Sequence, residues 1–330
     1  MIKSRNLFLL LIIFIIFVGC KKKEERINEE KFAFGTYIKL SIYSNNEKQA
    51  KKIMNSAFDE IERIDTKYNS KTKGSLVDIL NVKGKSTFDA EGLYLLKEVN
   101  KAYLMSNKKY DITMGPLMDA WGFSETAELR TTLPTPKELD KAALEVDYSN
   151  LKVEGNNIKF LKNGMELDTG SFLKGYAVEK AKELMMKEGV KSGFVSSISS
   201  IAAIGGKGDG SPWRIGIQNP DNPSDILGVV ELKNQSMGVS GDYQTYVTIG
   251  GKRYHHIIDK ETKYPVNDKR MVVVVNNNSL ISDLYSTAFF LMPINKVMEI
   301  ADRTQGLEVL IVDINNKIHL SKNFKFEKKQ

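Results

Sequence analysis

The sequence predicts an α+β fold in which largely antiparallel sheets pack against a few helices. Segments with the alternating pattern of strands outnumber the long segments with helical spacing, and the two kinds do not strictly alternate along the chain. A doubly wound parallel sheet would require that alternation. The composition, 42% hydrophobic and 27% charged over 330 residues, is typical of a globular protein and excludes a disordered, collagen-like or coiled-coil chain.

The N-terminus has the layout of a secretory signal peptide. Two basic residues precede an apolar run from Leu7 to Val18, which is shorter than the roughly 20 residues that a membrane-spanning helix needs. Cys20, the only cysteine, stands where a signal peptidase would cut. We therefore expect a signal peptide over residues 1–19 and a flexible tether over residues 20–31; an uncleaved anchor or a plain secreted protein is the alternative. With no second thiol, the mature chain can form no internal disulfide, and thiol catalysis is excluded.

The body is predicted to be one domain over residues 32–325, followed by a basic tail over 326–330. No internal repeat and no Gly/Ser linker divides it. Apolar residues at helical spacing predict helices over 48–68, 91–106 and 172–187 and from residues 137 and 280. Alternating or short apolar runs predict strands over 34–43, 193–204, 213–218, 228–232, 244–249, 252–258 and 271–275, with hairpins at 151–167 and near 315–316.

The net charge of +7 comes largely from short runs of lysine at the two ends of the chain. No stripe of Lys and Arg interleaved with aromatic residues lies in the body, so a nucleic-acid-binding surface is not expected.

Four segments carry more small, polar and charged residues than packing requires. In the first, residues 110–123, the Gly115-Pro116 step breaks an element and lets the backbone approach a ligand, while Trp121 and Phe123 could form the wall of a pocket. A turn with core aromatics is the simpler interpretation.

The second segment, residues 168–177, places Lys174 in the first turn of a helix, where free N–H groups suit a phosphate. Alternatively, Asp168 or Ser171 simply caps that helix.

The third segment contains His255 and His256, which point to opposite faces if they lie in a strand. With three His and one Cys in the chain, an ordinary zinc site is not available. One of the pair could contact a cofactor; otherwise it is a surface histidine beside Asp259.

The fourth segment places Asp283, Ser286 and Thr287 on one face near the start of the last long helix. Oxygen ligands of this kind suit Mg²⁺, which takes its remaining contacts from water and substrate phosphates. An aspartate near a helix start also matches the helix dipole without any metal.

Read in order, these segments resemble the ApbE family of flavin transferases from about Phe32 to about Asn323. The resemblance is carried by Phe34-Gly35-Thr36, Asp111–Leu117 with Trp121-Gly122-Phe123, Asp168–Ala177, Ser240–Tyr243, His256–Asp259 and Asp283–Ala288. The leader adds to it, because Phe17–Cys20 resembles a bacterial lipobox. That resemblance implies a lipoprotein with lipid, including palmitate, on Cys20, held on the extracytoplasmic side of the cell membrane.

The resemblance implies a T-fold-like domain and an Mg²⁺-dependent FAD:protein FMN transferase. Such an enzyme passes FMN from FAD to a Thr of a membrane redox protein through a phosphoester and releases AMP. It also implies an FAD site formed by Phe34, Tyr68, Lys109, Tyr110, Asp111, Asp168, Lys174 and Ile258. The implied Mg²⁺ ligands are Ser171, Asp283, Ser286 and Thr287. His256 would activate the acceptor hydroxyl.

The chain departs from the family pattern at a few positions. Ile198-Ser199 replaces a Gly-Gly pair, Lys260 and Lys263 replace Pro and Gly, and Ser286 replaces a second Asp. Two alternatives to the transferase therefore stay open. One is an FAD pyrophosphatase, in which water attacks instead of Thr; the other is a flavin-carrying lipoprotein without turnover.

Overall fold

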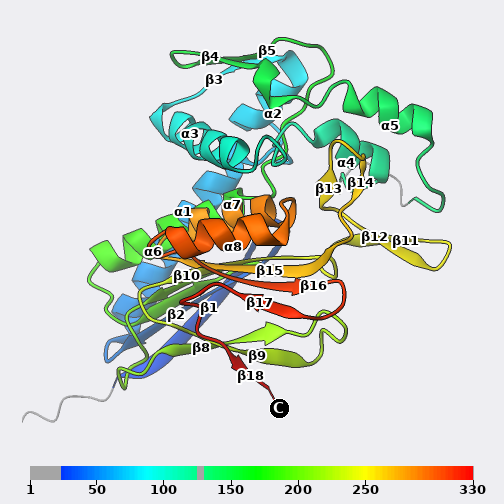
Figure 1. Cartoon of the computed structure of the whole chain (residues 1–330). Coiled ribbons are helices and arrows are strands. Elements are labelled where there is room, and N and C mark those ends of the chain that lie inside the picture. Colours follow the sequence, from blue (N-terminus) through cyan, green and yellow to red (C-terminus); the bar gives the residue numbers. More distant parts are fainter. Residues whose placement is uncertain (1–23, 125–129, 330) are drawn as a thin grey trace, which may run out of the picture.

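The structure, a computed structural model, describes residues 24–124 and 130–329 and confirms the predicted α+β class (Figure 1). Its helices are α1 (Glu47–Tyr68), α2 (Leu76–Lys83), α3 (Ala90–Met105), α4 (Gly115–Trp121), α5 (Pro136–Ala143), α6 (Leu173–Lys187), α7 (Ser279–Phe290) and α8 (Ile294–Arg303). A short 3₁₀ turn covers Tyr148–Asn150. In the described part of the chain, no helix is long and apolar enough to cross a membrane.

The strands form one large sheet and four small ones. The large sheet has the order β1-β2-β6-β7-β10-β15-β16-β17, and neighbouring strands are antiparallel. Its strands are β1 (Glu25–Ala33), β2 (Thr36–Ser44), β6 (Gly193–Ser196), β7 (Ser200–Ile204), β10 (Ser236–Gly241), β15 (Lys269–Asn276), β16 (Glu308–Asp313) and β17 (Ile318–Leu320). The small sheets contain β3 (Lys85–Thr87), β4 (Leu151–Glu154) and β5 (Asn157–Phe160); β8 (Trp213–Gln218), β9 (Ile226–Leu232) and β18 (Glu327–Lys328); β11 (Tyr246–Ile249) and β12 (Lys252–His255); and β13 (Ile258–Asp259) and β14 (Tyr264–Pro265).

Both faces of the large sheet are covered. In β15, Val272 and Val274 belong to the core beneath the helices, whereas Met271, Val273 and Val275 belong to a second core against β8 and β9. The period of two along a strand sends alternate residues to opposite faces, and a strand buried on both faces therefore reads as the continuous apolar run seen in the sequence. Helices α1, α6 and α7 cover one face and the β8–β9–β18 sheet covers the other (Figure 1).

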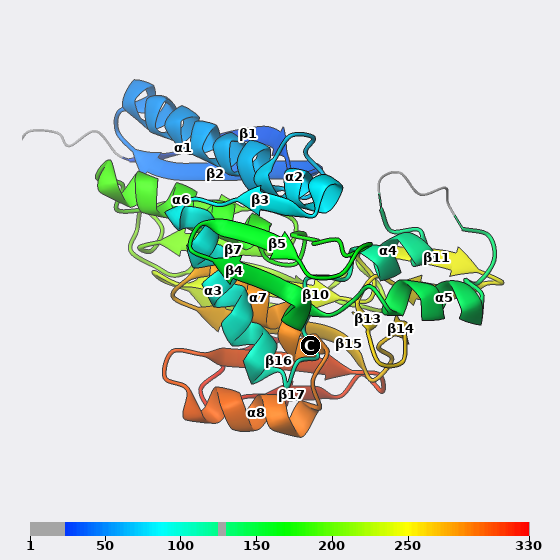
Figure 2. The same ribbon diagram turned by 90° about the horizontal axis from the view of Figure 1, so that it is seen from above.

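A smaller layer of α2, α3, α4, α5 and the β3–β5–β4 sheet lies beyond these helices, on the side away from the large sheet (Figures 1 and 2). The β11–β12 and β13–β14 hairpins lie beside α4 (Figure 1). A third apolar cluster joins α4 and α5 to Ile258 of β13. This arrangement brings the chain segments near residues 110, 170, 256 and 283 toward one region.

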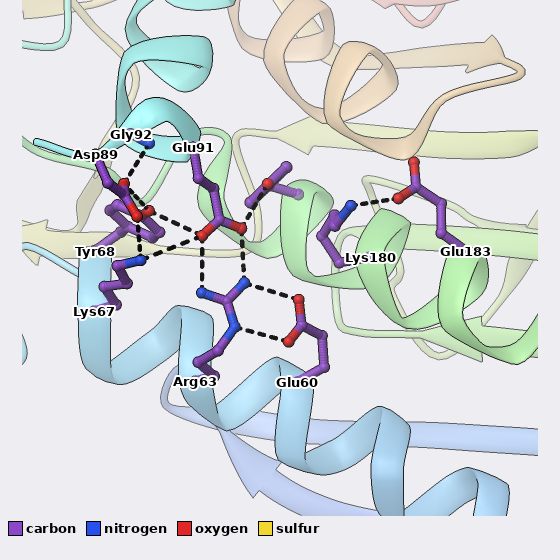
Figure 3. A network of polar contacts seen from close by, with 10 residues as sticks. Glu60, Arg63, Lys67, Tyr68, Asp89, Glu91, Gly92, Lys180 and Glu183 are labelled. Carbon is purple, nitrogen blue, oxygen red and sulfur yellow. Dashed lines mark hydrogen bonds and ion pairs between the residues drawn. The ribbon is translucent and has the colours of Figure 1, made fainter. Parts of the chain in front are cut away.

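A network of charged and phenolic side chains joins α1, α3 and α6 (Figure 3). Glu91 accepts two hydrogen bonds from Arg63, at 2.7 and 2.8 Å, and one each from the hydroxyls of Tyr68 and Tyr176. Glu60 binds the same guanidinium. Burial alone would raise the pKa of Glu91, but these hydrogen bonds outweigh it and lower the pKa to about 2.

We expect Glu91→Gln to lower the free energy of unfolding at pH 7 by about 2 kcal/mol, because a charged acceptor of four hydrogen bonds is lost. A carboxylate with a depressed pKa stabilises the fold above its unfolded pKa of about 4.3 and loses that contribution as pH falls toward 2. Urea unfolding should therefore show the gap between wild type and variant closing below pH 4. The exposed Glu183, paired with Lys180, provides the control: Glu183→Gln should change stability by less than about 0.5 kcal/mol. An equal effect of the two variants would contradict the account.

Most predicted elements are present, with a few corrections. The segment 193–204, predicted as one strand, forms the two antiparallel strands β6 and β7, and the strand predicted over 252–258 ends at His255. Residues 25–31, expected in a flexible tether, form most of strand β1, because their backbone pairs with β2 while the charged side chains face water. Phe34, expected to begin a strand, lies in the turn of that hairpin with φ +53. Two residues of the predicted basic tail pair with β9 as β18. The signal peptide, Cys20 and the first part of the tether lie outside the described residues.

Candidate functional site

A cavity of about 250 Å³ opens where the segments singled out in the sequence meet. It lies between the start of α6, the middle of α7, the end of β10 and the segments 110–118 and 256–258. The predicted site residues that line it are Tyr110, Asp111, Asp168, Ser171, Lys174, His256, Ile258, Asp283 and Thr287. Residues more than 170 positions apart therefore share one cavity.

Asp283 lies in the second turn of α7 and is 4% exposed, not at an exposed helix start as the sequence suggested. Its carboxylate accepts the Gly175 N–H of α6 at 2.8 Å. Gly175 permits this approach, because a Cβ there would lie 2.3 Å from the Asp283 Cβ. Burial raises the pKa of Asp283, and the charge of Lys174 lowers it only in part.

The N-terminus of α6 borders the cavity, and its first N–H groups are partly in use: Leu173 donates to the Thr169 carbonyl at 3.0 Å and Gly175 to the Asp283 carboxylate at 2.8 Å. Neither Asp168 nor Ser171 caps this helix, which has no side-chain cap at its N-terminal residue Phe172. Asp168 accepts the Gly170 N–H instead, at 2.6 Å, and Ser171 shares a hydrogen bond of 2.8 Å with the Tyr110 hydroxyl. The simple capping interpretation is therefore wrong, and the positive end of the helix dipole faces the cavity beside Asp283.

Hydroxyl groups continue the polar wall along α7. Ser240 of β10 shares hydrogen bonds with Ser286 at 2.8 Å and with Thr287 at 3.1 Å. Ser286 also donates to the Asp283 carbonyl and is fully buried, and it does not line the cavity. Ser240 does line it. Ser240 stands in the Ser240–Tyr243 motif but was not among the predicted site residues.

His256 forms the opposite wall. Its Nδ1 lies 3.2 Å from the Thr245 carbonyl, and its ring packs edge-on against Phe123. Burial lowers the pKa of His256 to about 4, so the ring is neutral at pH 7 and can accept a proton. His255 does not line the cavity and packs on Phe290. The strand expected over both histidines ends at His255, and His256 lies in the bend that follows it. Trp121, expected in a pocket wall, is buried in the third apolar cluster.

Three residues of the predicted FAD site do not line this cavity. Phe34 lies in the β1–β2 turn, where its N–H donates to Asp65. Tyr68 is 1% exposed because it continues the buried stripe of α1, and its hydroxyl binds Asp89 and Glu91. Lys109 forms an ion pair with Asp259 at 2.9 Å. Their roles toward FAD stay predictions.

Lys71 lines the cavity and was missed by the sequence analysis. Its loop is held in place by the neighbouring Ser70, whose N–H donates to Thr169 Oγ1 at 3.0 Å, next to Asp168. Lys71 and Lys174 thus bring two positive charges to one cavity that also contains three carboxylates, those of Asp111, Asp168 and Asp283. No periodicity marks a loop lysine, so only the fold reveals it.

The donors at Asp283 fit a magnesium ion. The carboxylate is buried, yet no Lys or Arg among residues 24–124 and 130–329 forms an ion pair with it. A buried charge without a counterion is costly, and oxygen donors from Asp283, Thr287 and Ser171 match the preference of Mg²⁺. The described residues contain no cluster of three or more His, Cys, Asp or Glu, so a metal here would take its remaining ligands from hydroxyl and carbonyl oxygens, water and substrate phosphates.

This chain is similar in sequence to known proteins of one family. The model of the ApbE family matches residues 34–311. The FAD:protein FMN transferase of Vibrio cholerae is 25% identical over 97% of this chain and 98% of that protein. One from Klebsiella pneumoniae is 30% identical over 61% of this chain and 59% of that protein.

Solved structures show the same fold. An ApbE protein from Thermotoga maritima superposes with a TM-score of 0.83 at 27% identity, covering 92% of this chain and all of that one. The flavin transferase ApbE from Vibrio cholerae gives a TM-score of 0.82 at 23% identity, covering 91% and 98%.

Proposed function

Because this chain belongs to the ApbE family, we propose that it is an FAD:protein FMN transferase that works with Mg²⁺. The observation that carries the proposal is the shared cavity of Asp168, Ser171, Lys174, His256 and Asp283. It combines a neutral histidine, a helix N-terminus and a buried carboxylate that no Lys or Arg of the described residues pairs with. Each of these features can serve the transfer of FMN from a pyrophosphate to a hydroxyl, with AMP as the leaving group.

In the proposed reaction, a Thr hydroxyl oxygen of the acceptor attacks the phosphorus on the FMN side of the FAD pyrophosphate. A phosphoester bond forms to FMN, the pyrophosphate bond breaks, and AMP leaves with that electron pair. The Thr proton passes to the neutral ring of His256. Bound Mg²⁺ would neutralise phosphate charge.

Other residues of the cavity would bind the pyrophosphate, the metal and a flat ring. Lys174, Lys71 and the N-terminus of α6 attract and orient the anionic pyrophosphate. Asp283 and Thr287, with Ser171, would hold the metal. Apolar residues of the opposite wall, among them Met114, Met118 and Ile258, offer a surface for a flat ring.

We further propose that the chain is lipid-anchored through Cys20 on the extracytoplasmic side of the membrane, where it would meet redox-complex proteins. The support is the leader sequence alone. Cys20→Ser should move the protein from the membrane fraction to the soluble fraction after export, as followed by immunoblotting. Unchanged membrane association of Cys20→Ser would contradict lipidation.

The direct test incubates the chain with FAD and Mg²⁺, with and without an acceptor domain that carries a Thr in an Asp-x-x-Ser/Thr-Gly/Ala-Thr segment. AMP release accompanied by flavin fluorescence on the denatured acceptor supports the transferase. AMP with only free FMN points to the pyrophosphatase, and tight FAD binding without AMP points to a carrier.

A further inference from the structure

The wall of the cavity that carries His256 continues into a very short hairpin; His256 itself lies between β12 and this hairpin, and its backbone N–H donates to the Thr245 carbonyl at 3.2 Å. Strands β13 and β14 pair through only Ile258 with Pro265 and Asp259 with Tyr264. An isolated two-stranded hairpin is marginally stable even when it is longer. Lys263 in its turn has φ +66, a left-handed conformation that costs a non-glycine residue about 1 kcal/mol. Contacts outside the hairpin must therefore fix this wall.

Two ion pairs join the hairpin to the segment 109–111. In the first the hairpin supplies the carboxylate, and in the second it supplies the ammonium. Lys109 binds Asp259 at 2.9 Å, and Lys260 binds Asp111 at 2.7 Å. Between them, Tyr110 points to Ser171 on the other side of the cavity. We call these two ion pairs the double latch.

Asp111 is a rigid anchor for this latch. Its side chain is fully buried, and one oxygen accepts the N–H and hydroxyl of Thr113 at 2.9 and 2.6 Å. The other oxygen accepts the Tyr148 N–H at 3.1 Å together with the Lys260 ammonium. The two carboxylate oxygens of Asp111 therefore accept four hydrogen bonds from the protein. Asp111 lines the cavity, but neither oxygen is left free to bind a ligand.

Lys260 is the more deeply placed cation of the two. Its side chain is 18% exposed, against 27% for Lys109, and its ammonium lies 5.3 Å from the centre of the Tyr103 ring. An ion pair in such a site is weakly screened by water and salt. Its removal leaves a buried carboxylate without a counterion.

We propose that Lys260, which stands where the ApbE pattern has a proline, is a positioning residue that holds the His256 wall at a fixed distance from the Asp283 side of the cavity. It acts through the hairpin and does not touch the reacting atoms. The expected change in kcat rests on the proposed function. The expected change in hydrogen exchange rests on the contacts of the hairpin alone. A shift of this wall misplaces the proton acceptor while the phosphate-binding residues, which belong to other elements, stay in place.

The test compares Lys260→Met, Lys260→Arg and Lys263→Met in the full chain. Lys263 is the matched control, because it lies in the same hairpin and its ammonium pairs with the exposed Asp140.

Two measurements are made. The first compares kcat for AMP release with the Kd for FAD, and the second is hydrogen exchange of backbone amides 256–266 without FAD. We expect Lys260→Met to lower kcat about 10-fold or more, to change the Kd less than about 3-fold, and to accelerate exchange in the hairpin. Lys260→Arg should restore kcat to within about 3-fold, and Lys263→Met should match the wild type.

Wild-type kcat and wild-type exchange in Lys260→Met would overturn the proposal, and so would a loss of FAD binding as large as the loss of kcat. If the wild type releases no AMP, the proposed function fails and hydrogen exchange alone decides the latch. If Lys260→Met does not fold, Lys109→Met breaks the more exposed ion pair and is measured in the same way. Normal kcat and exchange in that variant would also overturn the proposal.

Discussion

Asp283→Asn should abolish Mg²⁺-dependent AMP release, with a fall of about 10³-fold or more, while the protein stays folded. The carboxylate is buried and no Lys or Arg of the described residues pairs with it, so under the proposed function its charge is available to a cation. Loss of one preorganised charge at the reacting phosphate is worth about 10²–10³-fold or more.

Asparagine keeps an oxygen that can accept the Gly175 N–H, so the contact between α6 and α7 is retained. It also removes a desolvated charge, and we therefore expect an unchanged or higher melting temperature without Mg²⁺. Asp59→Asn, at an exposed position of α1, is the control. Turnover in Asp283→Asn that still responds to Mg²⁺ would remove Asp283 from the metal site.

His256→Ala should lower transfer to the acceptor by about 10²-fold or more with FAD still bound. The phosphate-binding groups Lys174 and Lys71 lie on other elements, so binding of FAD survives the substitution. Calorimetric titration with FAD and single-turnover transfer separate the two effects. Equal loss of binding and transfer would assign His256 to the binding surface instead.

The protonation of His256 determines how the transfer rate should depend on pH. Its pKa of about 4 keeps His256 neutral through the physiological range, so the rate should be flat between pH 6 and 8 and fall as pH drops toward 4. His319→Asn alters the third histidine of the chain, which pairs with Asp313 on β16 and β17, and should leave the profile unchanged. A rate that falls already near pH 7 would contradict a His256 ring that is neutral at that pH.

The sequence predicted the elements whose hydrophobic pattern is long and regular, such as α1, α3, α6 and β15. It did not predict α2 or α4, which are short, or α8, which follows the end of α7 after only three residues. It also missed β1, whose many charges resemble those of a solvated tether. Strand β1 is an edge strand and therefore needs few apolar residues.

The site was predictable where a motif placed side chains at fixed spacing, as for Asp283 with Thr287. It was not predictable where a loop folds back: Lys71 enters the cavity only through the contact of Ser70 with Thr169. Tyr68 illustrates a conflict between two signals, since it continues the stripe of Ile61 and Ile64, and that stripe is buried. For Asp111, the partner Lys260 lies 149 positions away, a pairing that no local pattern specifies.

The most direct test of the account is to map flavin on the acceptor by mass spectrometry after incubation with FAD and Mg²⁺, and to count AMP in the same reaction. The account predicts FMN bound through a phosphoester to a single Thr, one AMP per modified acceptor, and neither product with Asp283→Asn. Unmodified acceptor in the presence of AMP and free FMN would contradict the transferase.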